Sequence, residues 1–451
     1  MKYSHQNISP LDSRYASKIS NIRDNFNEGN LIKVRFEIEI DWLIFICTKY
    51  PKLFVSMNRI NINKLLKFKK SFNDQSIKRI KKIEKTTNHD VKAVEYFIRD
   101  HFQKDKQLQK FIHLIHFGLT SEDINSLSYA ILIRDGKKAY ITELVKLNKS
   151  IQKCASKWSN ISFLSRTHGQ PASPSTIGKE FKVFKKRLDS EIQILKSINE
   201  MAKFSGATGN FHTLELVDNK TNWINATKKF INQYKINQNP YTTQIESHDW
   251  ISQISHSFVR INNILTDLSQ DMWIYISNDI FSLKMINDEV GSSTMPHKVN
   301  PIDFENAEGN LGLSNALFNF FANKLSKSRL QRDLSDSTVL RNIGSAFGYA
   351  NLAIVSTQKG LSKITPNKKI ITKELDSNWE VLTEAVQTIM RLEGVTDAYE
   401  QIKKLSRGAS INEDDYIKFV TKLNISKTSK QKLLNLTPQS YVGISSYLSK
   451  N

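Results

Sequence analysis

The sequence predicts an all-α protein of three helical domains, of which the central one is a long helical bundle. Helix breakers are sparse, with 16 Gly and 9 Pro in 451 residues. Apolar residues recur at spacings of three and four over long intervals, whereas the period-two alternation of strands is nearly absent. Because 39% of the residues are hydrophobic, the chain can bury a sizeable core.

Two polar interruptions predict the domain boundaries. The first is "DKQLQK" at residues 105–110 and the second is "KITPNKK" at 363–369. They divide the chain into an N-terminal helical domain (1–110), a central long-helix bundle (111–365) and a C-terminal helical domain (366–451).

The N-terminal third carries three polar clusters: "SPLDSRY" at 9–15, "TTNHD" at 86–90 and "LTSEDI" at 119–124. The last is typical of a helix start, because Thr120 and Asp123 have the spacing of a capping box. Such a start leaves backbone N–H groups free to meet an anion, although Thr120, Ser121 and Ser175 can also serve only as helix caps.

Two histidines in "FIHLIHF" (111–117) are spaced for one helical face. His113 and His116 could suggest a metal pair, but no H-E-x-x-H or other third-ligand pattern accompanies them. The pattern therefore favours a core face and no metal site.

Within the central bundle, "SRTHGQPASPSTIGKE" (165–180) is interpreted as an irregular loop before a helix. That helix carries one apolar face and ends at the turn "SGATGN" (205–210); the face consists of Phe181, Phe184, Leu188, Ile192 and Leu195. The clearest helix lies between residues 241 and 290, which contain no Gly or Pro. Its a/d seam consists of Ile251, Ile254, Phe258, Ile261, Leu265, Leu268, Met272 and Tyr275.

The most unusual segment is "EVGSSTMPHKVNPIDFEN" (289–306), a polar stretch between long helices. Asn300 is a good N-cap, Pro301 suits the first helical position and Asp303 favours the first turn, so a helix begins here with its positive end toward the loop. From the residues alone, Ser292 is a candidate nucleophile. Downstream, "QRDLSDSTVLRN" (331–342) places Arg332, Ser337 and Arg341 close enough for a phosphate or carboxylate clamp.

The composition of the chain and the absence of certain motifs exclude several classes of function. The formal net charge is +21, but the Lys residues are scattered, which predicts a generally basic surface and no nucleic-acid site. The chain has only 2 Cys, no signal-peptide pattern and no apolar run of roughly 18 residues, so we expect a cytoplasmic protein without a membrane span. Neither G-x-G-x-x-G nor a P-loop occurs. We expect side-chain chemistry without a cofactor.

The motifs carry a family resemblance. "GSSTMPHKVNP" (291–301) resembles the signature loop of the fumarase/aspartase superfamily, helical lyases that release fumarate. Together with it, "SPLDSRY", "RIKKIEKTTNHDVKAVEYF", "IHFGLTSEDIN", "LSRTHGQPASPSTIGKE", "NPYTTQIESHD" and "QRDLSDSTVLRN" resemble the bacterial-type adenylosuccinate lyase family. The resemblance spans nearly the whole chain and is weakest around 51–75 and over the last domain.

The resemblance implies a β-elimination that splits adenylosuccinate into AMP and fumarate, and the ribotide SAICAR into AICAR and fumarate, without a cofactor. In matching motifs, it implies that Ser292 is the general base, that His168 is the general acid, and that Glu305 orients His168. A hydroxyl is a poor base in water, so Ser292 must act as an alkoxide stabilised by backbone dipoles and by Lys298. A loop with Gly291 can close over the substrate and exclude water.

The resemblance also implies substrate contacts and an assembly. The carried-over binding residues are Arg14, Tyr15, Asn88, His89, Asp90, Thr120, Ser121, Gln244, Ser293, Lys298, Val299, Asn300, Asn306, Arg332, Ser337, Thr338, Val339, Leu340 and Arg341. The implied assembly is a homotetramer whose core is the central bundle and whose four sites each draw residues from three chains. A helix of roughly 35 to 40 residues separates its ends by about 55 Å, so one chain cannot easily gather these segments.

Three alternatives remain open at this point. A sister lyase, such as an argininosuccinate lyase or fumarate hydratase, shares the loop but has no reason to bind phosphate. A basic nucleic-acid-binding helical protein shows a steep salt dependence and no turnover. A purely structural bundle tolerates substitutions in the polar loops.

Overall fold

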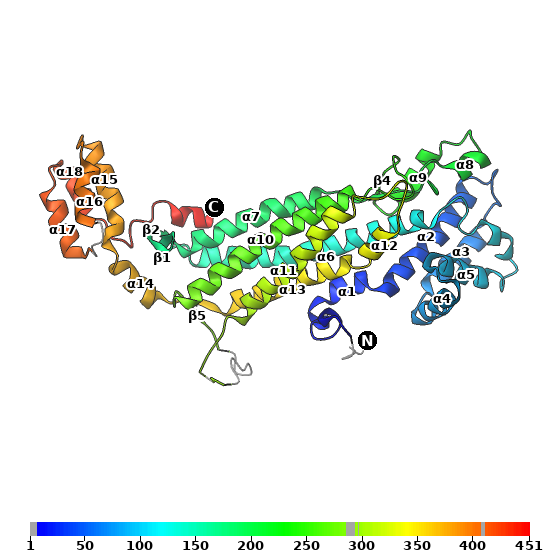
Figure 1. The fold of residues 1–451 in the computed structure, drawn as a ribbon, viewed down its shortest axis with the longest axis horizontal. Helices are drawn as coiled ribbons and strands as arrows, with labels where there is room; N and C mark the ends of the chain where they lie inside the picture. Colours follow the sequence, from blue (N-terminus) through cyan, green and yellow to red (C-terminus); the bar gives the residue numbers. More distant parts are fainter. Residues whose placement is uncertain (1–6, 286–293, 296, 407–410) are drawn as a thin grey trace. The chain divides into compact units, whose positions relative to one another are not determined.

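The computed structural model describes residues 7–285, 294–295, 297–406 and 411–451, which are mostly helical, so the all-α prediction is confirmed (Figure 1). The chain divides into two compact units, each assembled from three segments. Unit 1 comprises Met1–Glu143, Ile192–Asn262 and Asn310–Leu352; unit 2 comprises Leu144–Glu191, Asn263–Gly309 and Ala353–Asn451. This division differs in kind from the three sequence domains with boundaries at 110/111 and 365/366, which stay a prediction.

The long bundle helices contribute residues to both units. They are α6 (Ser121–Lys157), α7 (Ile177–Ser197), α10 (Asp249–Ser277), α11 (Ile302–Lys324) and α13 (Ile343–Lys363).

The other elements of unit 1 are the long helix α2, a set of shorter helices and one minimal sheet. They are η1 (Pro10–Asp12), η2 (Ala16–Ile19), α1 (Ser20–Phe26), α2 (Glu28–Lys49), α3 (Arg59–Lys70), α4 (Asp74–Thr87), α5 (Asp90–Phe102), η3 (Gln109–Leu114), β3 (Met201–Ala202), α8 (His212–Val217), α9 (Trp223–Asn232), β4 (Asn237–Gln238) and α12 (Ser335–Leu340). Strands β3 and β4 pair in parallel.

The other elements of unit 2 are two antiparallel strand pairs and the C-terminal helices. They are β1 (Ser162–Thr167), β2 (Gln170–Thr176), β5 (Phe281–Leu283), β6 (Ile364–Pro366), α14 (Lys368–Asp376), η4 (Trp379–Leu382), α15 (Thr383–Leu392), α16 (Ala398–Ser406), α17 (Glu413–Lys422), α18 (Lys427–Leu434) and α19 (Ser445–Lys450). Strand β1 pairs with β2, and β5 pairs with β6.

The heptad prediction for α10 is confirmed. Seven of its eight seam residues, from Ile251 to Met272, are buried, and Tyr275 is half-buried. In unit 1 the seam packs through aromatic rings: the centroid of Phe258 lies 4.3 Å from Tyr140, 4.4 Å from Phe318 and 4.6 Å from Phe347. Helices α6, α11 and α13 therefore all contact one side chain of α10.

The region around α2 in unit 1 has a second aromatic core. Phe36 stacks on Phe72 with centroids 4.9 Å apart, and Trp42 meets Phe204 and Phe230 at 5.1 Å each. Burial of such large rings supplies most of the stability of a helical layer.

Unit 2 has its own core between the bundle helices. Trp158, Phe181 and Phe281 contact one another, and the ring of Phe304 on α11 packs against Gly360 on α13 so closely that a Cβ there would overlap it. The apolar face predicted for α7 is buried along its whole length.

Three sequence expectations about boundaries were wrong. Residues 165–180 contain the β1–β2 hairpin rather than an irregular loop, because the two strands pair across a tight turn. Helix α7 ends at Ser197, before the turn at 205–210, and α11 begins at Ile302 rather than Pro301. The Pro301 carbonyl accepts from the amides of Phe304 and Glu305, so Pro301 is the N-cap residue, one position after the predicted Asn300. In the ranges that the structure covers, no helix is long and apolar enough to cross a membrane.

Candidate active site

The junction between α4 and α5 in unit 1 presents the three residues predicted from "TTNHD". Asn88 is the C-cap of α4 in the left-handed conformation (φ 50), which Asn tolerates better than most residues. His89 is the N-cap of α5 and Asp90 is its first residue. One sharp turn therefore brings an amide, an imidazole and a carboxylate to the same end of two helices.

The cap fixes the tautomer of His89. Its Nδ1 accepts a hydrogen bond from the amide of Lys92 at 3.2 Å, so Nδ1 carries no proton in the neutral ring. The proton then lies on Nε2, on a side chain that is 49% exposed. His89 can thus offer an N–H donor to a ligand while it caps α5.

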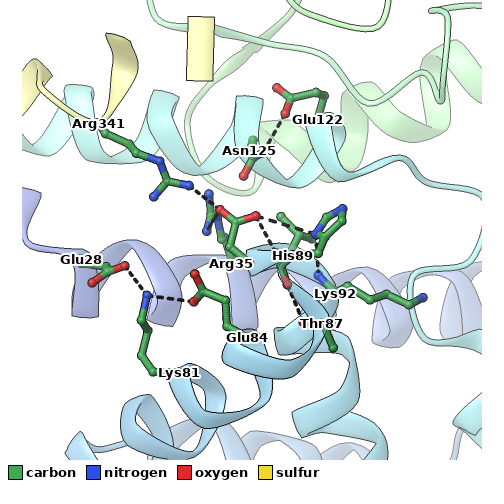
Figure 2. Close-up of polar contacts among 12 residues, drawn as sticks. Glu28, Arg35, Lys81, Glu84, Thr87, His89, Lys92, Glu122, Asn125 and Arg341 are labelled. Atoms are coloured by element: carbon green, nitrogen blue, oxygen red, sulfur yellow. Dashed lines mark hydrogen bonds and ion pairs between the residues drawn. The ribbon is translucent and has the colours of Figure 1, made fainter. Parts of the chain in front are cut away.

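Asp90 forms ion pairs with two arginines from distant segments, Arg35 and Arg341, both labelled in Figure 2. Its Oδ2 lies 2.9 Å from Arg35 Nη1 and 2.7 Å from Arg341 Nη2, and its Oδ1 accepts from the Val91 amide at 2.8 Å. Burial would raise the pKa of Asp90, but the two guanidinium charges and the backbone hydrogen bond lower it to about 2.

The two arginines differ in exposure. The side chain of Arg35 is 3% exposed and that of Arg341 is 43% exposed. Arg341 can therefore turn from Asp90 to a substrate oxygen while Arg35 keeps Asp90 neutralised. One carboxylate and two guanidinium ions leave a net positive charge, which favours the binding of an anion.

A second network of unit 1 surrounds Arg332. Its Nη2 donates to Glu122 Oε1 at 2.8 Å and its Nη1 donates to Gln244 Oε1 at 3.0 Å. Glu122 also accepts from Asn125 at 2.7 Å, and Asp336 lies 4.0 Å from Arg332 Nε. The predicted contact residues Gln244 and Arg332 are therefore hydrogen-bonded to each other. The Arg332 guanidinium contacts side chains from α6, from α12 and from the loop of Gln244.

The start of α6 confirms the helix start predicted from "LTSEDI". The Thr120 amide donates to Asp123 Oδ2 at 2.8 Å, and Ser121 is the first helical residue. Both Thr120 and Ser121 are half-buried. Their segment adjoins the Arg332 network through Glu122.

Two cavities of unit 1 border these residues. One of about 550 Å³ is lined by the loops on both sides of Gln244, among them Thr243 and Ile245, and by Ser328. Another of about 290 Å³ is lined by Ser9, Asp12 and Arg341. The second cavity brings the N-terminal "SPLDSRY" segment next to Arg341.

The remaining predicted residues of unit 1 lie near these cavities in sequence. Arg14 is exposed and its guanidinium lies 5.9 Å from the Tyr15 ring centroid. Ser337, Thr338, Val339 and Leu340 form most of the six-residue helix α12, and Arg341 is its C-cap.

In unit 2, His168 occupies the turn of the β1–β2 hairpin. Thr167 pairs with Gln170, so His168 and Gly169 are the two central turn residues, with φ of 53 and 76. Positive φ at both positions is the geometry of a type I′ turn. A non-glycine residue in this conformation is uncommon, although His adopts it more readily than most residues. Its side chain is exposed.

The signature segment of unit 2 is described in part. Gly291, Ser292 and Ser293 lie outside the described residues, whereas Lys298 and Val299 are exposed and Asn300 is half-buried at the start of α11. On α11, Glu305 accepts from Trp273 Nε1 at 3.1 Å and Asn306 accepts from Ser356 Oγ at 2.7 Å. No contact between Glu305 and His168 is present among the described residues of one chain, and the orienting role of Glu305 stays a prediction.

Sequence reasoning missed some polar residues that the structure assembles, chiefly Arg35, Glu39 and His116. His116 Nδ1 lies 2.6 Å from Glu39 Oε1, and its Nε2 lies 3.9 Å from Glu95 Oε1. The core-face interpretation of "FIHLIHF" was wrong for His113, which is exposed, and incomplete for His116, which is ion-paired. A buried helix that carries Arg35 and Glu39 in a hydrophobic run was the available signal.

Comparisons with known proteins place this chain in a class. A family model described as "Lyase" matches residues 13–313, and one described as "Adenylosuccinate lyase C-terminal" matches 328–442. Among solved structures, the fold is similar to a fumarate lyase from Mesorhizobium (TM-score 0.78, 15% identity, 96% of this chain and 97% of that one). It is also similar to the 3-carboxy-cis,cis-muconate lactonizing enzyme of Pseudomonas putida (TM-score 0.74, 16% identity, 95% and 94%). The chain is thus a lyase of the fumarase/aspartase superfamily.

The curated relatives define the family within that class. Adenylosuccinate lyases from Legionella pneumophila (strain Corby), Buchnera aphidicola (subsp. Schizaphis graminum) and Escherichia coli (strain K12) are 46%, 45% and 43% identical to this chain. The alignments cover 98%, 98% and 97% of this chain and 98%, 97% and 96% of the relatives. The chain belongs to the adenylosuccinate lyase family.

Proposed function

We propose that this protein cleaves adenylosuccinate to AMP and fumarate, and SAICAR to AICAR and fumarate, in purine nucleotide biosynthesis. The observation that carries the proposal is the similarity to adenylosuccinate lyases over nearly the whole chain. The arginines of unit 1 support it, because a phosphorylated dicarboxylate needs several cationic contacts.

The proposed chemistry is a β-elimination. Ser292 removes the proton from the carbon next to a succinyl carboxylate, and His168 protonates the departing nitrogen. The position of His168 at an exposed hairpin tip supports a role as proton donor, since the ring is accessible to a ligand. Glu305 would orient the His168 ring, and Lys298 with the N-terminus of α11 would lower the cost of the Ser292 alkoxide.

Substrate binding is assigned to the two arginine groups of unit 1. Arg341, with Arg14, Tyr15 and Ser337, would hold phosphate or carboxylate oxygens, and Thr120 with Ser121 would hold a succinyl carboxylate. Gln244 and Arg332 would contact the substrate from the opposite loop. The remaining contacts are proposed for Asn88, His89, Asp90, Ser293, Val299, Asn300, Asn306, Thr338, Val339 and Leu340.

A spectrophotometric assay of adenylosuccinate cleavage by the purified protein tests the reaction. We expect loss of the substrate absorbance with formation of AMP and fumarate in equal amounts. Argininosuccinate and fumarate are the matched alternatives, because they test the sister activities of the superfamily. Turnover of either one, without cleavage of adenylosuccinate, would replace the proposed function.

The proposed assembly is a homotetramer with sites shared between chains. His168→Ala and Ser292→Ala should each be inactive, and unfolding and refolding them together should restore activity. Random mixing restores about a quarter of the sites if the two residues of each site come from different chains of a closed tetramer. Hybrid tetramers that are confirmed by mass spectrometry and are still inactive would show that one chain supplies both residues.

We also propose a cytoplasmic location, which the thiol state supports. Cys47 and Cys154 are both free, as is usual for proteins of reducing compartments.

A further inference from the structure

A buried ion pair joins the segments of unit 1 that carry the proposed carboxylate contacts. Lys203, next to β3, and Asp123, in the first turn of α6, have side chains that are 0% exposed. Lys203 Nζ lies 2.9 Å from Asp123 Oδ1 and donates to the carbonyls of Gly206 at 2.7 Å and Gln244 at 2.8 Å. The buried ammonium group is therefore compensated by one carboxylate and two backbone carbonyls.

Asp123 is held by three backbone amides and by the ion pair. It accepts from the amides of Thr120 (2.8 Å), Ser205 (2.9 Å) and Gly206 (3.1 Å), and Lys203 supplies the opposite charge. These contacts compensate the burial of the carboxylate. Because both side chains are 0% exposed, neither is open to direct contact with a substrate.

The pair nevertheless determines where ligand-contacting groups lie. Through the Thr120 amide it fixes the entrance to α6, and through the Gln244 carbonyl it fixes the loop whose side chain accepts from Arg332. The Gln244 amide also donates to the Gln331 carbonyl at 3.2 Å, next to Arg332. Three segments that are far apart in sequence thus depend on one buried ammonium ion.

We infer that Lys203 and Asp123 are positioning residues that hold Thr120, Ser121, Gln244 and Arg332 in register for the dicarboxylate end of the substrate. The inference rests on the proposed function for the identity of that substrate. Loss of the pair should release the Gln244 and Thr120 segments and weaken contacts made in both the ground state and the transition state, so KM should rise more than kcat falls.

The chain offers a matched control pair in the same unit. Lys137 on α6 lies 2.5 Å from Glu200, and the side chains are 8% and 9% exposed. Lys137 also donates to the Ile198 carbonyl at 2.6 Å, and neither residue contacts a proposed substrate residue. Removal of this pair costs a buried ion pair without disturbing the proposed register.

The experiment compares Lys203→Met, Lys203→Met with Asp123→Asn, and Lys137→Met with Glu200→Gln in the full-length protein. The double variant at 203 and 123 leaves no unpaired buried charge, so it folds even if Lys203→Met does not. We expect KM for adenylosuccinate to rise about tenfold or more in the Lys203 variants and to stay unchanged in the Lys137 variant of similar thermal stability. Equal KM values in the two double variants would overturn the inference.

Hydrogen exchange separates this inference from the proposed function. Peptides that cover 117–121, 203–210 and 240–247 should all lose protection in the Lys203 variants, and none should do so in the Lys137 variant. A loss confined to 203–210 would show that the pair does not hold the other two segments. If the unsubstituted protein fails to cleave adenylosuccinate, the proposed function fails while this exchange result still decides the positioning role.

Discussion

The buried His116 makes the stability of this protein depend on pH in a way that can be calculated. Its ring contacts Glu39 at 2.6 Å and faces Glu95 at 3.9 Å, and Glu95 is also paired with Lys92 at 2.7 Å. The side chains of His116 and Glu39 are 14% and 1% exposed. Burial would lower the pKa of His116, but the charge and hydrogen bond of Glu39, with Glu95 and Asp123, raise it from 6.5 to about 9.

The sign follows from linkage. Because the pKa is raised on folding, the charged ring stabilises the folded chain below pH 6.5, and this contribution disappears as the pH rises through 9. The shift from 6.5 to about 9 corresponds to about 3 kcal/mol. The stability difference between the unsubstituted protein and His116→Gln should therefore fall by about 3 kcal/mol between pH 6 and pH 10.

Urea unfolding at a series of pH values and one protein concentration measures this difference. His113→Gln is the matched control, because His113 is exposed and lies three residues away on the same short segment. A difference between His116→Gln and the unsubstituted protein that stays constant from pH 6 to pH 10 would refute the reasoning.

Three other substitutions, and one control substitution, test the site and its scaffold. Asp90→Asn should lower the free energy of unfolding by about 2 kcal/mol at neutral pH, because the folded pKa of about 2 lies below the ordinary 3.8. The loss should vanish as the pH falls from 4 to 2; denaturant titrations at pH 7 and pH 3 measure it, and equal losses would contradict the ion-pair account. Gly209→Ala should cost about 1–3 kcal/mol in thermal unfolding, because Gly209 has φ of 84 and its Cβ would overlap the Thr242 carbonyl. Gly394→Ala, with the same φ but open space around it, should cost less. Ser292→Ala should lower kcat by orders of magnitude while substrate affinity, measured by calorimetry, changes little; near-normal turnover would remove Ser292 as the base.

Local periodicity was enough to predict two of the bundle helices, α7 and α10. A helix with a buried stripe leaves a spacing of three and four in the sequence, and the seam from Ile251 to Met272 is buried as predicted. The β1–β2 hairpin was missed because Pro171, Pro174 and Gly169 obscure the alternation of a strand. Its turn uses a histidine where Asn or Gly is the usual signal.

The polar contacts had no such local signature. Asp90 and Arg341 are separated by 251 residues, and Arg332 and Glu122 by 210. The sequence suggested Arg332 and Arg341 as parts of one clamp and Asp90 through the family resemblance, but only the packed helices of unit 1 show that Arg332 pairs with Glu122 and Arg341 with Asp90. Arg35, Lys203 and His116 were absent from the predicted site because a buried charge is recognised by its partner, and the partner is far away in sequence.

His168 has two properties that a substitution can change together: its imidazole side chain and its left-handed backbone conformation. The residue must supply an imidazole for the proposed chemistry and must also occupy the left-handed region at φ 53. Alanine removes the imidazole and also strains the turn, so an inactive His168→Ala protein does not show which of the two was lost. Asparagine tolerates that backbone region, which makes His168→Asn the cleaner way to silence the proton donor while the loop keeps its shape. An insertion between Thr167 and Gln170 would have the opposite effect. It would keep every functional group but change the position and orientation of the His168 imidazole.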